Sequence, residues 1–287
     1  NIHCTCTRSV ASCIWLVMEG RKPDYSFLMG YCGISEEEAK KRTDDTVDAI
    51  KAAGHHMYKC MESRRFASSQ LHKHPAYPEV RARFGDPDFS LIELGCSFGT
   101  DARQMIFDGL EVGKLTVSDL HDFYWNLGRD VLFKDDTSAV KTVFMDFAVP
   151  FGEGGPGTVA EAFTERFDVV SAMAILHVLS EQQCTQFLKN VFISLRKRGG
   201  LLFGLCVGSG VARDWSTIPT DGLPSREPTP RFLHSRDSLH ELLSSLGFTD
   251  VRVTAVVLNE SMTAVIPDRE PGDVWTLITF SASRDDA

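Results

Sequence analysis

Residues 91–99 read LIELGCSFG, and residues 100–107 continue as TDARQMIF. The apolar run Leu91–Leu94 predicts a short buried strand and the second segment predicts a helix, with Gly95 and Gly99 in the turn between them. Glycines in such a turn allow positive φ and close approach of a ligand, and the helix start offers unpaired N–H groups. The turn therefore predicts a site for a nucleoside or an amino-acid carboxylate, although a turn needed only for packing would have the same spacing.

Short apolar runs recur along the chain and alternate with helical segments. Strands are expected at 91–94, 115–117, 142–145, 167–170, 201–205, 251–258 and 274–280, and the clearest helices at 181–196 and 235–246. Strands alternating with helices predict a parallel sheet with right-handed crossovers, and the last two strands read as an antiparallel ending. The predicted fold class is α/β: a Rossmann-like seven-stranded, mostly parallel sheet with an antiparallel last strand, plus an N-terminal helical cover.

The chain divides into three parts by composition. Residues 1–17 lack a pattern and precede an ordinary start at Met18, so they are expected to be non-native or disordered. Residues 18–78 are expected to form the helical cover or lid, with a helix over 35–61 that begins at the capping residue Ser35. The two prolines of the segment His72–Pro78 end this part, and residues 79–287 form the ligand-binding domain.

Composition narrows the classes of partner. The 287 residues are 43% hydrophobic and 24% charged, as in an ordinary folded protein. A net charge of -9 argues against nucleic acid and favours a small-molecule partner. The eight cysteines lack the paired spacing of a zinc site, so no metal is expected. The interrupted apolar stretch Val10–Met18 is shorter than the ~20 residues that cross a bilayer, so we expect no integral membrane segment.

Three acidic residues follow three successive predicted strands: Glu93, Asp119 and Asp146. Because ligands of open α/β sheets bind beyond the carboxyl ends of the strands, these side chains should converge on one crevice. Asp119 could accept both hydroxyls of a ribose, and Asp146 an adenine amino group with Phe147 beside the ring. Each acid alone is as easily explained as a helix cap, but together they favour an adenosyl ligand.

The glycine spacing separates two kinds of cofactor. A dinucleotide site requires a second glycine two residues after Gly95, where this chain has Ser97, and no Walker motif is present. The predicted cofactor is therefore S-adenosyl-L-methionine, whose zwitterionic tail can meet the turn from Gly95 to Gly99. An NAD-dependent dehydrogenase is a weaker alternative.

Four stretches carry a resemblance to a known family: HPAYPEV (74–80), LIELGCSFGTDARQMIFDGL (91–110), VSDLHDFYWNLGRDVLFKD (117–135) and FDVVSAMAILHVL (167–179). Together they resemble fungal secondary-metabolite methyltransferases, particularly those that methyl-esterify carboxylic acids in meroterpenoid biosynthesis. The resemblance covers roughly residues 30–260, and its most particular block runs from Asp119 to Phe133. The chain departs from the family pattern at 57–66 and 205–207, which leaves the methyl acceptor open.

The resemblance implies that residues 79–287 form a class I S-adenosylmethionine-binding methyltransferase domain. It also implies a biosynthetic enzyme that is cytoplasmic, or loosely associated with a membrane. The expected cofactor-binding residues are Glu93, Gly95, Cys96, Ser97, Gly99, Asp119, Leu120, Asp146, Phe147 and Ala172.

His177 follows the fourth predicted strand and is the candidate catalytic residue, with a packing histidine as the alternative. A carboxylic acid is already ionised at neutral pH and needs an orienting donor, whereas a phenol needs a base. Candidate substrate residues are Arg64, His74, Tyr77, Phe98 and Trp125, although solvated or packed side chains would explain each of them.

The sequence and the resemblance together predict O-methylation of a small-molecule natural-product intermediate in fungal secondary metabolism. A carboxylate, which would become a methyl ester, is the preferred acceptor over a phenol. Two alternatives stay open: a non-catalytic regulator on the same fold, and an enzyme that uses S-adenosylmethionine for cyclisation or pericyclisation without transferring the methyl. A homodimer is one assembly that the sequence leaves open.

Overall fold

The computed structural model describes residues 23–152, 159–217, 229–258 and 273–286. The prediction for residues 1–17 therefore lies outside the described residues. Within these ranges, no helix is both long and apolar enough to cross a bilayer.

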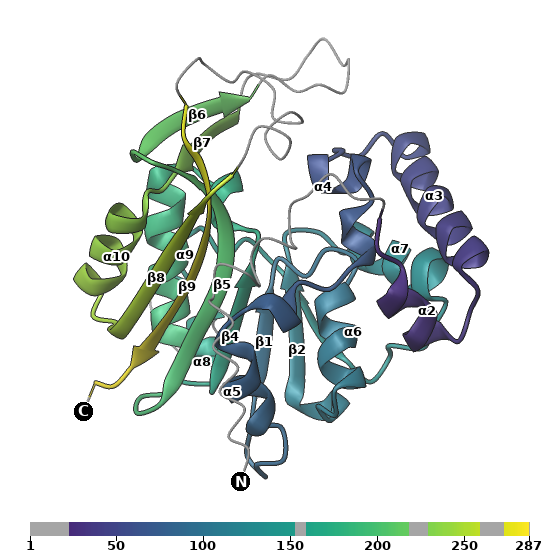
Figure 1. The fold of residues 1–287 in the computed structure, drawn as a ribbon. Coiled ribbons are helices and arrows are strands. Elements are labelled where there is room, and N and C mark those ends of the chain that lie inside the picture. Colours follow the sequence, from purple (N-terminus) through teal and green to yellow (C-terminus); the bar gives the residue numbers. More distant parts are fainter. Residues whose placement is uncertain (1–22, 153–158, 218–228, 259–272, 287) are drawn as a thin grey trace, which may run out of the picture.

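A seven-stranded sheet forms the centre of the molecule (Figure 1). The strands β1–β5 pair in parallel, and β9 pairs antiparallel with both β5 and β8. The predicted fold class is confirmed. In spatial order the strands are β3 (Lys141–Phe144), β2 (Leu115–Asp119), β1 (Leu91–Leu94), β4 (Val169–Met173), β5 (Gly200–Ser209), β9 (Trp275–Arg284) and β8 (Thr249–Val257).

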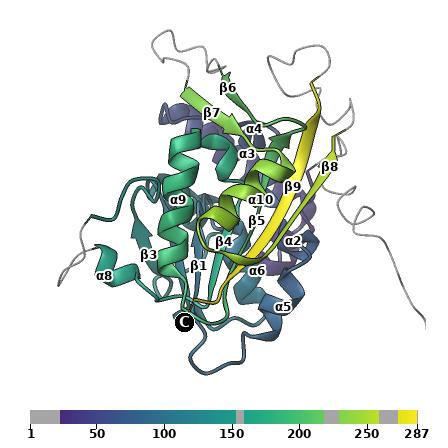
Figure 2. The same ribbon diagram turned by 90° about the vertical axis from the view of Figure 1, so that its left-hand side faces the viewer.

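Helices cover both faces of the sheet, because successive side chains of a buried strand point to opposite sides. Leu91 packs in the core beneath α5 and α6, whereas Ile92 packs in the core beneath α9 and α10, which lie together on one face in Figure 2. These helices are α5 (Tyr77–Ala82), α6 (Thr100–Phe107), α9 (Glu181–Ser194) and α10 (Arg236–Ser245), and a short helix α8 (Val159–Phe163) follows β3.

The predicted helix over 35–61 is too long. Helix α3 (Glu36–Ala52) begins at the expected cap, where Ser35 Oγ accepts from the Glu38 N–H. It ends before Gly54, whose φ of +66° is a left-handed conformation that stops a helix. The chain then resumes in α4 (Lys59–Glu62).

The N-terminal helices share a hydrophobic core with a later segment of the chain. Helices α2 (Ser26–Cys32) and α3 pack onto α7 (Phe123–Leu127) and the π-helix η5 (Gly128–Phe133). The buried members of this core are Tyr25, Leu28, Ala39, Ile50, Met61, Ala67, Phe98, Tyr124, Leu132 and Phe133. The helical cover is thus continuous in packing with the segment that follows β2.

A two-stranded hairpin, β6 (Arg213–Thr217) and β7 (Thr229–Leu233), extends from the end of β5 and was not predicted. In Figure 1 it lies beyond the same end of the sheet as α4. The Phe232 N–H donates to Leu179 O at 2.8 Å, and the Ser209 N–H donates to His234 O at 2.9 Å. These bonds attach the hairpin to the segment that follows β4 and to the carboxyl end of β5.

One fully buried arginine connects these parts. Arg103 of α6 donates to both carboxylate oxygens of Asp135 at 2.7 and 2.8 Å, and to the carbonyls of Phe98 and Gly99 at 3.0 and 3.1 Å. Its guanidinium lies 4.3 Å from the Phe133 ring centroid and 5.0 Å from that of Trp125. These contacts hold the glycine turn after β1 against the segment after β2, on which the N-terminal helices pack.

We predict that Arg103→Met lowers the free energy of unfolding by about 3–5 kcal/mol, because it leaves a largely buried carboxylate on Asp135 without its partner. The matched control is Arg129→Met, which breaks an exposed pair with Asp130 and should cost less than about 1 kcal/mol. Urea unfolding of the three proteins measures both values. Equal losses in the two variants would contradict a special role for Arg103.

Candidate functional site

The turn after β1 has the backbone shape that the glycines predict. Gly95, Ser97 and Gly99 all have positive φ, at +70°, +48° and +71°, and Gly99 is the N-cap of α6. The N–H groups of Gly95 and Cys96 donate to Ser118 O at 2.8 and 3.1 Å. A Cβ on Gly99 would overlap the Trp125 ring, so both backbone conformation and packing require glycine there.

Asp119 ends β2 directly beside this turn. Its Oδ2 accepts from the Ser97 N–H at 2.8 Å and its Oδ1 from the Leu120 N–H at 2.7 Å. Partial burial raises the pKa of Asp119, and these N–H donors oppose the rise. The two bonds fix the carboxylate in place, and each oxygen still has a lone pair for a hydroxyl donor.

Glu93 lies beneath the turn and is 3% exposed. Its Oε2 is buried without a hydrogen-bond partner among the described residues, as is Oγ of its register neighbour Ser171 on β4. Burial raises the pKa of Glu93 well above its usual range, Asp101 adds to the rise, and Arg103 opposes it. A buried carboxylate oxygen without a donor is costly, so this position suits a ligand that supplies one.

The two unpartnered atoms lie at the switch point of the sheet. From β1 the chain proceeds outward through β2 and β3, and then returns to the other side of β1 with β4 and β5. In open α/β sheets, ligands bind outside the carboxyl ends of the strands at this reversal. Glu93 of β1 and Ser171 of β4 are paired across it.

The remaining predicted cofactor residues have different surroundings. Oδ1 of Asp146 accepts from the Ala148 N–H at 2.8 Å, and Leu120 is 54% exposed. The Phe147 ring is buried against Phe151, Phe163 and Phe187, so a cofactor contact there would have to use its backbone. Cys96 and Ala172 are buried, at 3% and 0% exposure. Their roles as cofactor residues stay predictions.

His177 lies in η6 (Leu176–Val178), directly after β4. Its Nδ1 accepts from the Val207 N–H at 3.4 Å. Burial, aided by the nearby charge of Arg231, lowers the pKa of His177 to about 4. The ring is therefore neutral at pH 7, and since Nδ1 accepts, Nε2 carries the hydrogen. In this tautomer His177 can donate a hydrogen bond, but its one lone pair is already engaged.

The predicted substrate residues are not brought together. Arg64 pairs with Asp44 and donates to Glu62 O. His74 is 2% exposed, with Nε2 at 2.9 Å from Gly204 O, and burial lowers its pKa to about 4. The remaining three are also buried: Tyr77 donates to Asp108, Phe98 packs on Phe66, and Trp125 packs over Gly99. Substrate roles for these five residues stay predictions.

The hairpin contributes two side chains that sequence reasoning missed. Trp215 and Arg231 are cross-strand partners, and the Arg231 guanidinium lies 5.9 Å from the centroid of the Trp215 ring. The sequence did contain a signal for these strands, because polar and apolar residues alternate in the runs RDWST and TPRFL. The prolines around these runs obscured that signal.

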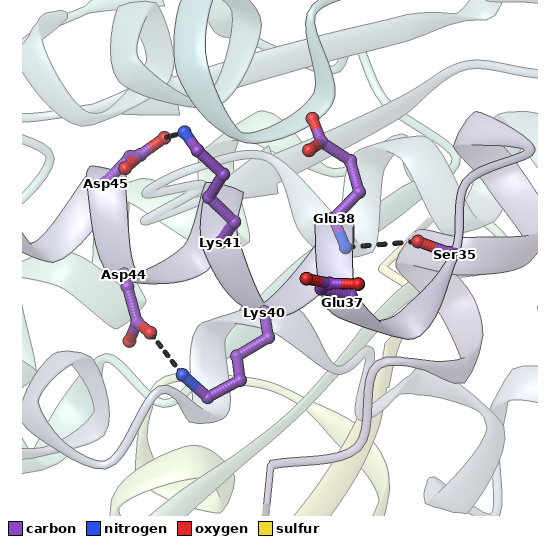
Figure 3. Close-up of a pocket in the computed structure, with 7 residues that line it drawn as sticks. All are labelled: Ser35, Glu37, Glu38, Lys40, Lys41, Asp44 and Asp45. Carbon is purple, nitrogen blue, oxygen red and sulfur yellow. Dashed lines mark hydrogen bonds and ion pairs between the residues drawn. The ribbon is translucent and has the colours of Figure 1, made fainter.

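A hollow lies on the outer face of α3 (Figure 3). Its charged side chains pair along the helix, Lys40 with Asp44 at 2.8 Å and Lys41 with Asp45 at 2.7 Å. Such i,i+4 pairs are typical of a solvated helix face. This hollow gives no reason to expect a ligand there.

Comparison with known proteins agrees with this geometry. No protein-family model matches the chain. The chain is 28% identical over 196 residues to the asnovolin E/chermesin D methyltransferase nvfJ of Aspergillus novofumigatus, covering 68% of this chain and 66% of that protein. It is 28% identical over 181 residues to the methyltransferase adrK of Penicillium roqueforti, covering 63% and 62%. The alignments thus span about two thirds of these relatives or less.

Among solved structures, the N-terminal domain of EvdMO1 with SAH bound superposes with a TM-score of 0.51 at 14% identity, covering 79% of this chain and 85% of that one. This likeness concerns the fold alone. The strand order defines a Rossmann-like sheet with an antiparallel ending. In sequence, the chain resembles fungal secondary-metabolite methyltransferases, which confirms the resemblance inferred from its motifs.

Proposed function

We propose that this chain is an S-adenosylmethionine-dependent O-methyltransferase of fungal secondary metabolism that converts a small-molecule carboxylate into its methyl ester. The observation that carries the proposal is the cluster at the switch point. There the fixed carboxylate of Asp119, the glycine turn and the unpartnered oxygen of Glu93 lie at the ends of adjacent strands. The similarity to fungal methyltransferases supports the same activity.

The residues present fit the cofactor. Asp119 has acceptor capacity for ribose hydroxyls, and the turn Gly95–Gly99 admits an amino-acid tail close to the backbone. Oε2 of Glu93 lacks a donor that an ammonium group would supply. When bound, S-adenosylmethionine supplies an electrophilic methyl group on a positively charged sulfur.

The reaction requires alignment more than proton transfer. A carboxylate oxygen forms the new C–O bond with one of its lone pairs, the C–S electron pair stays on sulfur, and an ester and a neutral thioether result. No proton is gained or lost. Holding the two reactants in line can supply roughly 7–11 kcal/mol.

The state of His177 favours a carboxylate over a phenol as acceptor. A phenol must lose a proton, and a neutral His177 with its lone pair on Val207 is poorly placed to take it. The Nε2–H can instead donate to an anionic oxygen and orient it. This supports ester formation.

We extend the proposal to the rest of the molecule on the basis of its packing. Residues 18–78 would act as a cover for the acceptor, since their described helices share a core with the segment after β2. A cytoplasmic site of action and a homodimer remain part of the proposal.

We predict that binding of S-adenosylhomocysteine strengthens as pH rises and is accompanied by proton release from Glu93. Burial raises the pKa of Glu93 in the free protein, whereas the ammonium group of the ligand favours the ionised carboxylate. The complex therefore holds fewer protons, and affinity should increase with pH until the free carboxyl is itself ionised. Titration calorimetry in buffers of different ionisation enthalpy counts the protons.

Glu93→Gln should abolish this proton release, and Asp130→Asn, a change at an exposed site, should keep it. Identical proton release from wild type and Glu93→Gln would rule out the assignment.

The proposed activity is tested by methyl transfer from labelled S-adenosylmethionine to a panel of terpenoid and polyketide acids and phenols. We expect label in an alkali-labile product from at least one acid, and none when the same acid is supplied as its methyl ester. Asp119→Ala should abolish cofactor binding and transfer together, because the ribose loses its acceptor. Cofactor binding without any transfer would contradict the enzyme assignment and favour a regulator or a non-methylating cyclase.

A further inference from the structure

The hairpin carries an aromatic and cationic cluster on one of its faces. Trp215 packs edge-on against Trp275 of β9, with ring centroids 5.0 Å apart. Arg213 lies over the Trp275 ring at 5.7 Å, and Arg231 lies over the Trp215 ring at 5.9 Å. The two arginines therefore occupy similar positions on neighbouring indole rings.

The two arginines differ in their anionic partners. Arg213 donates to Asp273 at 2.7 Å. No carboxylate in the described part of the chain pairs with Arg231. The buried Nε atoms of both arginines lack a hydrogen-bond partner there, so the two differ in the counter-charge alone. Burial lowers the pKa of Arg231, with Tyr58 opposing the change. A partly buried guanidinium without a counter-charge is costly, and an anionic ligand would offset that cost.

Arg231 is held near His177. The next residue, Phe232, donates its N–H to Leu179 O at 2.8 Å, which fastens β7 to the chain just after η6. His177 is in turn bonded to Val207 of β5, at the carboxyl end of the sheet. The strand β7, which carries Arg231, contacts η6, which carries His177, and the charge of Arg231 contributes to the low pKa of His177.

We propose that Arg231 binds the carboxylate of the methyl acceptor, together with the Nε2–H of His177. This inference rests on the proposed function and names the residue that selects an acid over a neutral acceptor. A planar guanidinium matches the two oxygens of a carboxylate and stays charged, and a neutral histidine adds a donor without removing a proton. The acceptor class is a carboxylic acid.

Calorimetric titration with 1-adamantanecarboxylate and its neutral isostere 1-adamantanecarboxamide tests this, with saturating S-adenosylhomocysteine present. Wild type should bind the carboxylate about tenfold or more tighter than the carboxamide, since hydrogen bonds to charged groups are stronger than neutral ones. Arg231→Gln should remove that preference. Arg231→Lys should retain part of that preference, because the positive charge remains but the paired N–H donors of the planar guanidinium are lost.

Arg252→Gln is the matched control, since Arg252 lies exposed on β8, and it should keep the full preference. Affinity for S-adenosylhomocysteine should be unchanged in every variant, which also shows that each one folds. Wild type without a preference for the carboxylate, or Arg231→Gln that keeps it, overturns the inference. Either result leaves the methyltransferase proposal standing if labelled ester still forms, whereas failure of wild type to bind S-adenosylhomocysteine would sink the proposed function itself.

Discussion

The buried guanidinium of Arg103 is the interaction on which the arrangement of the site depends. It holds two carbonyls of the glycine turn and both oxygens of Asp135. Asp135 also accepts from the Tyr31 hydroxyl of α2 at 2.9 Å. One charged group thus joins the first helix of the described chain, the turn after β1 and the segment after β2. Because all these partners lie in a packed interior, none can move far without leaving a charge or carbonyl unpaired.

This constraint fixes the shape of the turn, and the sheet topology supplies the chemistry around it. The strands β1 to β5 are parallel, so their carboxyl ends lie at one edge of the sheet, and the order in which the chain adds strands reverses between β1 and β4. Glu93 and Asp119 lie near that edge but differ in their hydrogen bonding. Asp119 accepts hydrogen bonds from two backbone N–H groups, whereas Oε2 of Glu93 has no donor among the described residues. In the proposed function, Asp119 would accept hydrogen bonds from hydroxyl groups and Glu93 would receive a cation. That asymmetry is what an adenosyl amino acid requires.

The sequence predicted the fold well because each buried strand is a short apolar run with turn residues at its ends. It also predicted a helix at 181–196, where α9 spans Glu181–Ser194. The sequence-based predictions failed where contacts between residues far apart in the chain determine the local structure. The helix over 35–61 was overextended, since a single glycine in a polar segment gives little warning of a stop. The hairpin was missed because its strands become stable only through pairing with each other and attachment to β5.

Side-chain surroundings could be predicted for the cofactor region only in part. Acids at strand ends follow from register, but nothing local indicated that the Phe147 ring turns into the core or that His74 bonds to Gly204. Arg231 lies more than 50 residues from His177 in sequence, and only the hairpin brings them near each other.

The proposed function requires a cofactor to bind at the switch point between β1 and β4. Hydrogen–deuterium exchange with and without S-adenosylhomocysteine measures this binding at the residues concerned. We expect slower exchange at residues 95–100 and 119–121, with no change along α3. Unchanged exchange at the turn, or protection confined to the charged face of α3, would contradict it.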